Sequence, residues 1–299
     1  MKIEYDNEFV CNNHSASNER ADIFIAKAMN ISRTKATDII RERLAYKNEQ
    51  VIDKSSTIIL FGDTVKIAKP YKRKIKKKID LNLKVIYEND DFIVIDKPPF
   101  ISCHESNNMD SSYTIADWII DNDIWKDELS DIERAGIVHR LDKNTSGVLL
   151  IAKSFKTQES LMDLFKNRKV KKQYDAITTG RIQQQGIIKY KITRNPLNPT
   201  KMTHSIGSGK DAETEYVLIK AYNKYNHVHF FPKTGRTHQI RVHTSAIGSP
   251  ILGDEVYGAQ SNLINRHALH ASSIEFSLDG NKYNFRSEIP NDILNLIKK

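Results

Sequence analysis

Residues 136–153, GIVHRLDKNTSGVLLIAK, place a short polar loop between two apolar stretches. The second stretch, Val148–Ala152, predicts a buried β-strand. The loop before it holds one carboxylate, Asp142, and loops held by rigid strands commonly display functional side chains. Asp142 is therefore a candidate catalytic residue. The alternative is that Asp142 only caps a local turn, in which the neighbouring polar residues bond the backbone.

The sequence on both sides of this stretch alternates strand signals with a few helical ones. Strands are predicted near Val85–Tyr87, Phe92–Ile95, Tyr174–Thr178, Glu213–Ile219, His227–Phe231 and Ser273–Phe276, and a helix near residues 161–165. The glycine loops of nucleotide-binding folds are absent. Frequent short strands with few helices favour a mixed, largely antiparallel α+β domain over residues 81–299.

Residues 1–68 form a different pattern, which predicts a small α+β module. Apolar residues recur at helical spacing between Ala21 and Met29, and Ser32 is the predicted N-cap of a second helix. Short apolar pieces typical of strands follow Asn48. The helical segment also brings four cations close together in sequence, a pattern that predicts a phosphate-contacting face: Arg33, Lys35, Arg41 and Arg43.

A basic block separates these two regions. Residues 69–79, KPYKRKIKKKI, hold seven basic side chains and no acidic one, out of a net charge of +9 for the whole chain. Such runs resist packing and attract polyanions through counterion release. We expect residues 69–80 to be a linker that faces RNA through Lys72, Arg73 and Lys74. A linker that is only solvated is the alternative.

Composition excludes several classes of protein. The chain has 299 residues, of which 39% are hydrophobic and 28% charged, values typical of a folded protein of about two domains. No apolar run approaches the ~20 residues of a membrane span, and the first residues lack the pattern of a signal peptide. The two cysteines, Cys11 and Cys103, have no paired spacing. We therefore expect a cytoplasmic protein that does not associate with membranes.

Five motifs in the larger region, in order along the chain, resemble those of the RluA-type pseudouridine synthases. They are His139-Arg140-Leu141-Asp142 with Thr145-Ser146-Gly147, Lys172-Gln173-Tyr174-Asp175-Ala176, Gly235-Arg236-Thr237-His238-Gln239-Ile240-Arg241-Val242-His243, Gly253-Asp254-Glu255-Val256-Tyr257-Gly258, and Leu269-His270-Ala271. Together they extend over about residues 84–290. The resemblance implies an enzyme that isomerises uridine in RNA to pseudouridine.

The resemblance also implies roles for individual residues. Asp142 would be the catalytic carboxylate, which either attacks the anomeric carbon or removes a sugar proton. Arg241 would hold that carboxylate ionised, and Tyr174 would stack on the flipped uracil and help to remove its C5 proton. Arg140 would fill the space that the base leaves, or only contact phosphate.

The small module resembles the S4-like RNA-binding domain. The matching positions are Arg20, Ile31-Ser32-Arg33, Ile39-Ile40 and Gly62-Asp63-Thr64-Val65. This pairing of domains favours large-subunit ribosomal RNA as the substrate, with transfer RNA as the alternative. An ordinary protein-binding module is the other interpretation of residues 1–68.

No metal or organic cofactor is predicted to take part in the chemistry. His238 and His243 are five residues apart, a spacing that suits neither one face of a strand nor one face of a helix, and the chain has no HExxH motif and no Cys/His quartet. The isomerisation itself needs no oxidant and no energy donor.

Two other classes of function remain as alternatives. A non-catalytic RNA-binding or ribosome-assembly protein would have no need of Asp142, Tyr174 and Arg241 together. A glycosidase that used Asp142 as nucleophile would need a second carboxylate, which the sequence does not offer convincingly. One stretch, Lys97–Glu105, departs from the Lys-Pro-Ala-Gly pattern of the pseudouridine synthases, so RNA contacts made by that loop are expected to differ.

Overall fold

The computed structural model describes residues 5–11, 18–41, 44–68, 78–104, 112–126, 136–198 and 201–298, and the chain divides into two compact units, residues 1–75 and residues 76–299. Each unit is described by itself. Every helix in the described ranges is too short or too polar to span a bilayer.

The smaller unit contains two helices and short strands. Its elements are β1 (Tyr5–Val10), β2 (Glu19–Arg20), α1 (Ala21–Met29), α2 (Arg33–Arg41), β3 (Ala45–Lys47), β4 (Gln50–Val51), β5 (Ile58–Ile59) and β6 (Thr64–Ala68). Strands β1, β6, β3 and β4 form one antiparallel sheet. Ser32 precedes α2, and its Oγ accepts a hydrogen bond from the Lys35 amide, as predicted for an N-cap.

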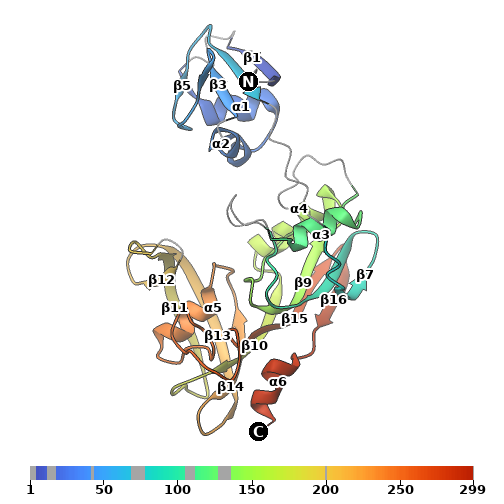
Figure 1. The fold of residues 1–299 in the computed structure, drawn as a ribbon, viewed down its shortest axis with the longest axis vertical. Coiled ribbons are helices and arrows are strands. Elements are labelled where there is room, and N and C mark those ends of the chain that lie inside the picture. The colour runs from blue at the N-terminus through green and yellow to red at the C-terminus, as the bar shows by residue number, and fades with distance from the viewer. Residues whose placement is uncertain are drawn as a thin grey trace. The chain divides into compact units, whose positions relative to one another are not determined.

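The larger unit is built around one ten-stranded sheet (Figure 1). Its strands are β7 (Lys84–Glu88), β8 (Phe92–Lys97), β9 (Ser146–Ala152), β10 (Lys171–Thr178), β11 (Gln185–Arg194), β12 (Met202–Ser205), β13 (Lys210–Ala221), β14 (Asn226–Pro232), β15 (Leu269–Leu278) and β16 (Asn281–Arg286). The order across the sheet is β12-β11-β13-β14-β10-β15-β9-β8-β7, with β16 paired to β15. Among the described strands, only β9 and β15 pair in parallel. The predicted mixed, largely antiparallel α+β fold is therefore confirmed.

In the described part of the larger unit, four helices accompany the sheet: α3 (Ile115–Asp121), α4 (Phe155–Lys166), α5 (Gln239–Ala246) and α6 (Asn291–Ile297). Helix α4 packs against β9 and β15, and α5 packs against β11, β12, β13 and β14. Strand β9 is buried along its whole length because it lies in the sheet interior with apolar clusters on both faces. The sequence predicted β9 and α4, but it did not locate α3, α5 or α6.

Gly147 allows β9 and β15 to approach closely. A Cβ atom on Gly147 would lie 2.2 Å from the carbonyl oxygen of Ala271, and its φ of +117° lies in a region that other residues rarely adopt. The parallel pairing of Ala271 with Gly147 therefore depends on the absence of a side chain. This pairing places the loop that carries Asp142 beside the centre of the sheet.

Candidate active site

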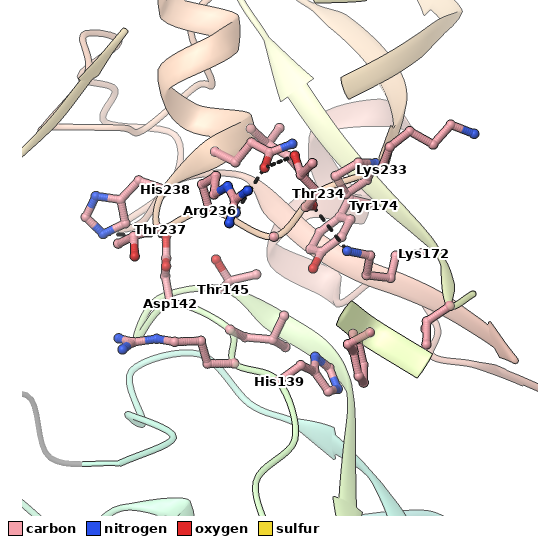
Figure 2. A pocket seen from close by; sticks show the side chains of 18 of the residues that line it. His139, Asp142, Thr145, Lys172, Tyr174, Lys233, Thr234, Arg236, Thr237 and His238 are labelled. Atoms are coloured by element: carbon pink, nitrogen blue, oxygen red, sulfur yellow. Dashed lines mark hydrogen bonds and ion pairs between the residues drawn. The ribbon is translucent and has the colours of Figure 1, made fainter. Parts of the chain in front are cut away.

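The larger unit contains a cavity of about 550 Å³ where several elements meet. Its walls come from the loop before β9, from β10, and from the segment that joins β14 to α5. Figure 2 shows Asp142, Thr145, Tyr174 and His238 around this space. A volume of this size is typical of pockets that bind small molecules, and it suits one extruded nucleotide.

Asp142 forms an ion pair with Arg241 at the edge of the cavity. Arg241 Nη1 donates to Asp142 Oδ2 over 3.0 Å. The other side of the guanidinium binds Asp254 in bidentate fashion, with 2.8 Å from Nε to Oδ2 and 3.0 Å from Nη2 to Oδ1. Asp254 is fully buried and also accepts hydrogen bonds from the amides of Val256 and Tyr257. Asp254 therefore fixes the orientation in which Arg241 meets Asp142.

The site keeps Asp142 ionised although it is largely enclosed. Burial by itself would raise the pKa of Asp142, but His238 and Arg241 outweigh burial, so that pKa lies below its ordinary value. Burial lowers the pKa of His238, so Arg241 is the cation that acts at neutral pH. Oδ2 contacts both Arg241 and His238, and Oδ1 has no partner among the described residues. Oδ1 is thus available to a substrate.

His238 is held in one tautomer by Tyr257. Met202 donates its amide hydrogen to the Tyr257 hydroxyl, and this hydroxyl lies 2.8 Å from Nδ1 of His238. We assign the phenolic hydrogen to this contact, which leaves the imidazole hydrogen on Nε2. Nε2 lies 3.8 Å from Oδ2 of Asp142, so it presents a hydrogen to the side of the carboxylate.

Tyr174 lines the same cavity from β10. Burial and the nearby Asp142 raise the pKa of Tyr174 well above its ordinary value, so the side chain is a neutral phenol at neutral pH. Its ring packs against two apolar clusters of the unit. Asp142, Tyr174 and Arg241, which the sequence predicted as one site, lie together as expected.

The loop that carries Asp142 is anchored at several points. His139 Nε2 accepts the Leu150 amide hydrogen over 2.9 Å, and burial lowers the pKa of His139 to about 3, so the ring is neutral. The buried Lys97 donates to the carbonyl oxygen of Lys143 over 3.2 Å, and the buried Arg266 donates to that of Asn144 over 3.1 Å. These contacts fix the loop on both sides of Asp142.

Several cations line the cavity. Those that line it are Arg140, Lys166, Arg168, Lys172, Lys233 and Arg236. Lys172 is half-buried, its desolvation lowers its pKa to about 8, and its Nζ donates to the Thr234 carbonyl. Arg140 is exposed and its Nη1 lies 3.3 Å from Nε2 of His104. Lys171, by contrast, pairs with Glu275 and does not line the cavity. This arrangement fits an RNA backbone around an extruded base.

The cations predicted for the smaller unit are partly paired with acids. Arg33 is exposed, and its Nε lies 2.9 Å from Asp22 Oδ2, while Arg41 pairs with Asp38. Lys35 is half-buried near the start of α2. The remaining predicted cations of the small unit and the linker, Arg43, Lys72, Arg73 and Lys74, lie outside the described residues.

The loop that departs from the pattern of the pseudouridine synthases keeps the shape that glycine would allow. Phe100, at the position of the glycine, has φ of +70° and is 52% exposed. Lys97 also donates to the carbonyl oxygens of Pro98 and Ile101, so it closes the turn around Phe100. An exposed aromatic ring therefore stands where the resemblance predicts no side chain.

Sequence reasoning expected His238 to be a polar group packed around the arginine motif, but it missed the supporting roles of Asp254 and Tyr257. Each lies inside one of the motifs, but the contacts join positions that are far apart in the chain, so spacing does not reveal them.

One cluster of side chains carries the donor atoms of a metal site. Among the described residues, the one cluster with the donors of a metal site, Asp175, His227 and His229, does not line this cavity.

Comparisons with known proteins agree with this geometry. Residues 91–246 match the family of RNA pseudouridylate synthases. An uncharacterized RNA pseudouridine synthase from Helicobacter pylori is 31% identical over 294 residues, which cover 94% of this chain and 90% of the relative. The ribosomal large subunit pseudouridine synthase D of Salmonella typhimurium is 31% identical over 285 residues, covering 89% and 85% of the two chains.

A solved structure has the same fold. Human RNA pseudouridylate synthase domain containing 1 superposes with a TM-score of 0.57 at 27% identity, over 71% of this chain and 86% of the human chain. Its fold and the sequence matches point to the same conclusion as the cavity with its ionised carboxylate. The chain belongs to the RluA-type RNA pseudouridine synthase family and is an isomerase that acts on RNA.

Proposed function

We propose that this enzyme converts uridine to pseudouridine in large-subunit ribosomal RNA, with Asp142 as the catalytic carboxylate. The observation that carries the assignment is the geometry of Asp142: Arg241 holds Oδ2, Oδ1 has no partner among the described residues, and the residue lines a cavity of nucleotide size. Support for the substrate comes from relatives named ribosomal large subunit pseudouridine synthase D, at 31 to 35% identity. Transfer RNA is the alternative that the test below separates.

The reaction breaks the N1–C1′ bond of uridine, turns the uracil and joins C5 to C1′. N1 ends with a hydrogen and C5 loses one, so atoms balance without a co-reactant. An ionised carboxylate can attack C1′ or remove the C2′ proton, and both roles need a free oxygen on Asp142. Arg241 keeps the carboxylate charged and oriented, because Asp254 holds the guanidinium in place.

In this proposal Tyr174 forms one wall of the base pocket. Its ring offers a stacking surface worth ~1–3 kcal/mol per base, and its phenolic oxygen can take up the C5 proton as the phenol gives its own hydrogen to the nearby Asp142 carboxylate. The cations that line the cavity bind phosphates and hold the flipped nucleotide, and Arg140 enters the space that the base leaves.

We also propose that residues 1–68 form an S4-like RNA-binding domain. Support comes from the packing at its matching positions: Arg20 and Arg33 both pair with the buried Asp22, at 3.0 and 2.9 Å. This network fixes the junction between α1 and α2 and leaves one face of each arginine exposed to a ligand.

The test uses two arms. Asp142→Asn should lower pseudouridine formation by at least about 10³-fold, with RNA affinity within a few fold of the wild type. Asp90→Asn removes an exposed carboxylate of the same unit and should be fully active. Near-normal activity of Asp142→Asn would exclude the proposed role.

Mapping pseudouridine in total RNA from cells with and without the protein tests the substrate. Losses confined to transfer RNA would overturn the ribosomal assignment but not the role of Asp142.

A further inference from the structure

A second cluster of functional side chains lies on the sheet away from the cavity. Asp175 is on β10, and His227 and His229 are on the neighbouring strand β14. Asp175 pairs directly with His229 across the two strands. His227 and His229 are two residues apart on one strand, so both imidazoles project to the same face. The strand register therefore brings three donors from two strands together.

The three donor atoms are already close to the spacing of a metal site. Asp175 Oδ1 lies 2.6 Å from Nε2 of His227 and 3.0 Å from Nε2 of His229. Two ligands at 2.0–2.2 Å from a tetrahedral zinc ion lie about 3.3 Å apart. Small rotations of the side chains reach that distance. All three donor atoms lie within 4.8 Å of one another.

Charge favours a cation at this place. Asp175 is buried, with 4% of its side chain exposed, and no described lysine or arginine forms an ion pair with it. Buried carboxylates are normally paired with a cation or bound to a metal. The two imidazoles approach Asp175 Oδ1 at hydrogen-bonding distance, and a divalent ion held by the three side chains would supply positive charge next to the carboxylate. His229 has 26% of its side chain exposed, which leaves a path for the ion and room for a water ligand.

The surroundings also suit a metal-bound imidazole. The Gln173 side-chain amide lies 3.4 Å from Nδ1 of His229. When Nε2 of a histidine binds a metal, Nδ1 carries the hydrogen and needs an acceptor. The Gln173 amide can present its oxygen, because its nitrogen and oxygen are interchangeable by a flip.

We propose that Asp175, His227 and His229 bind one zinc ion, which joins β10 to β14 on the face of the sheet opposite the cavity. Tyr174 and Asp175 are consecutive residues on β10, so their side chains point to opposite faces. None of the three ligands lines the cavity. The ion stabilises the two strands that carry Tyr174 and lead into the Lys233–His238 segment, and it takes no part in the isomerisation.

The test measures zinc content of the purified full-length protein by mass spectrometry, after removal of metal, incubation with zinc chloride and desalting. The wild type should retain one zinc per chain. His227→Gln and His229→Gln should each retain less than about a tenth of that amount. His204→Gln removes an exposed histidine from β12 and should bind zinc as the wild type does. Magnesium should not be retained, because imidazole suits zinc better.

A second measurement locates the ion. Zinc should raise the melting temperature of the wild type and of Asp142→Asn, whose cavity is altered, but not that of His229→Gln. His229 is the most exposed of the three ligands, so its variant should fold even if the other two do not. Equal zinc content in His229→Gln and the wild type, or no zinc in the wild type, would overturn the proposal. A melting shift lost in Asp142→Asn would do so too, because it would place the ion in the cavity.

Discussion

Arg241 donates a hydrogen bond from Nη1 to Oδ2 of Asp142 over 3.0 Å, although the two residues lie 99 positions apart in the chain. The contact joins helix α5 to the loop before β9, two segments that both line the cavity. It also places a permanent charge beside the carboxylate, because Asp254 and Asp142 raise the pKa of Arg241 despite its burial. The ionisation of Asp142 therefore depends on helix α5, which is remote in sequence.

Replacing Arg241 by lysine should shift the pH dependence of the reaction. Lysine keeps the charge but loses the planar fork that binds Asp254 and Asp142 together. The replaced cation then stabilises the Asp142 carboxylate less, so the effect of burial dominates and the pKa of Asp142 rises. The acid limb of kcat/KM against pH should move to higher pH, and activity at pH 7 should fall at least about tenfold. Arg181→Lys, an exposed change in the same unit, should leave the profile unchanged.

The same variant should alter stability at low pH. In the wild type the folded-state pKa values of Asp142 and Asp254 lie below their ordinary values. Their contribution is therefore present above about pH 4 and is lost as pH falls through the folded-state pKa values. Arg241→Lys should flatten this dependence in urea unfolding between about pH 5 and about pH 2. An unchanged slope and an unchanged acid limb would contradict the role given to Arg241.

Tyr174 variants should separate stacking from proton transfer. RNA tritiated at C5 of uridine releases label to water as product forms. Tyr174→Phe keeps the ring and loses the hydroxyl, so it should bind RNA well and release tritium slowly. Tyr174→Ala also loses the stacking surface, so it should bind more weakly, by ~1–3 kcal/mol.

Full activity of Tyr174→Phe would show that Tyr174 is only a platform for the base. The proton acceptor would then be sought elsewhere, with Asp142 the next candidate. Tyr283→Phe, which removes a hydroxyl from β16 outside the cavity, is the matched control and should behave as the wild type does.

The basic linker should contribute to RNA affinity through charge alone. The triple change Lys72→Gln, Arg73→Gln and Lys74→Gln removes three cations, so the slope of log K against log salt should become shallower by about 2–3 if all three contact phosphates. The same number of changes at Lys84, Lys282 and Lys298, which do not line the cavity, should leave the slope unchanged. If the slope became shallower for the control variant and not for the linker variant, the proposed contact between the linker and RNA phosphates would be wrong.

The parts of the fold that the sequence predicted are those in which local pattern and tertiary environment agree. Strand β9 is a continuous apolar run because both of its faces are covered, and α4 keeps apolar residues at helical spacing over the sheet. Helix α5 was not found, because Ile240, Val242 and Thr244 are β-branched and favour strands locally. Six of its residues are buried, so packing and not propensity maintains it.

Within the site, motif residues were predictable and their partners were not. Resemblance indicated Asp142, Tyr174 and Arg241, since each lies in a recognisable motif. The bidentate contact of Asp254 with Arg241 and the proximity of His227 and His229 to Asp175 depend on strand register and helix placement. Register is a property of the folded sheet, so one sequence does not reveal it.

Gly147 is expected to be required for stability because the neighbouring strand leaves no room for a side chain, and not only because its backbone has a positive φ. Gly258 has almost the same φ, +118° against +117°, but a Cβ there would meet no atom within 4 Å. Gly258→Ala should therefore cost only the backbone strain of a positive φ, about 1–3 kcal/mol. Gly147→Ala carries that strain and also a contact of 2.2 Å with the Ala271 carbonyl, so β9 and β15 must separate. Its free energy of unfolding should fall by at least about 2 kcal/mol more than that of Gly258→Ala. Because this pairing positions the Asp142 loop, activity measured well below the melting temperature should fall as well. Equal destabilisation of the two variants would show that the sheet absorbs the new methyl group.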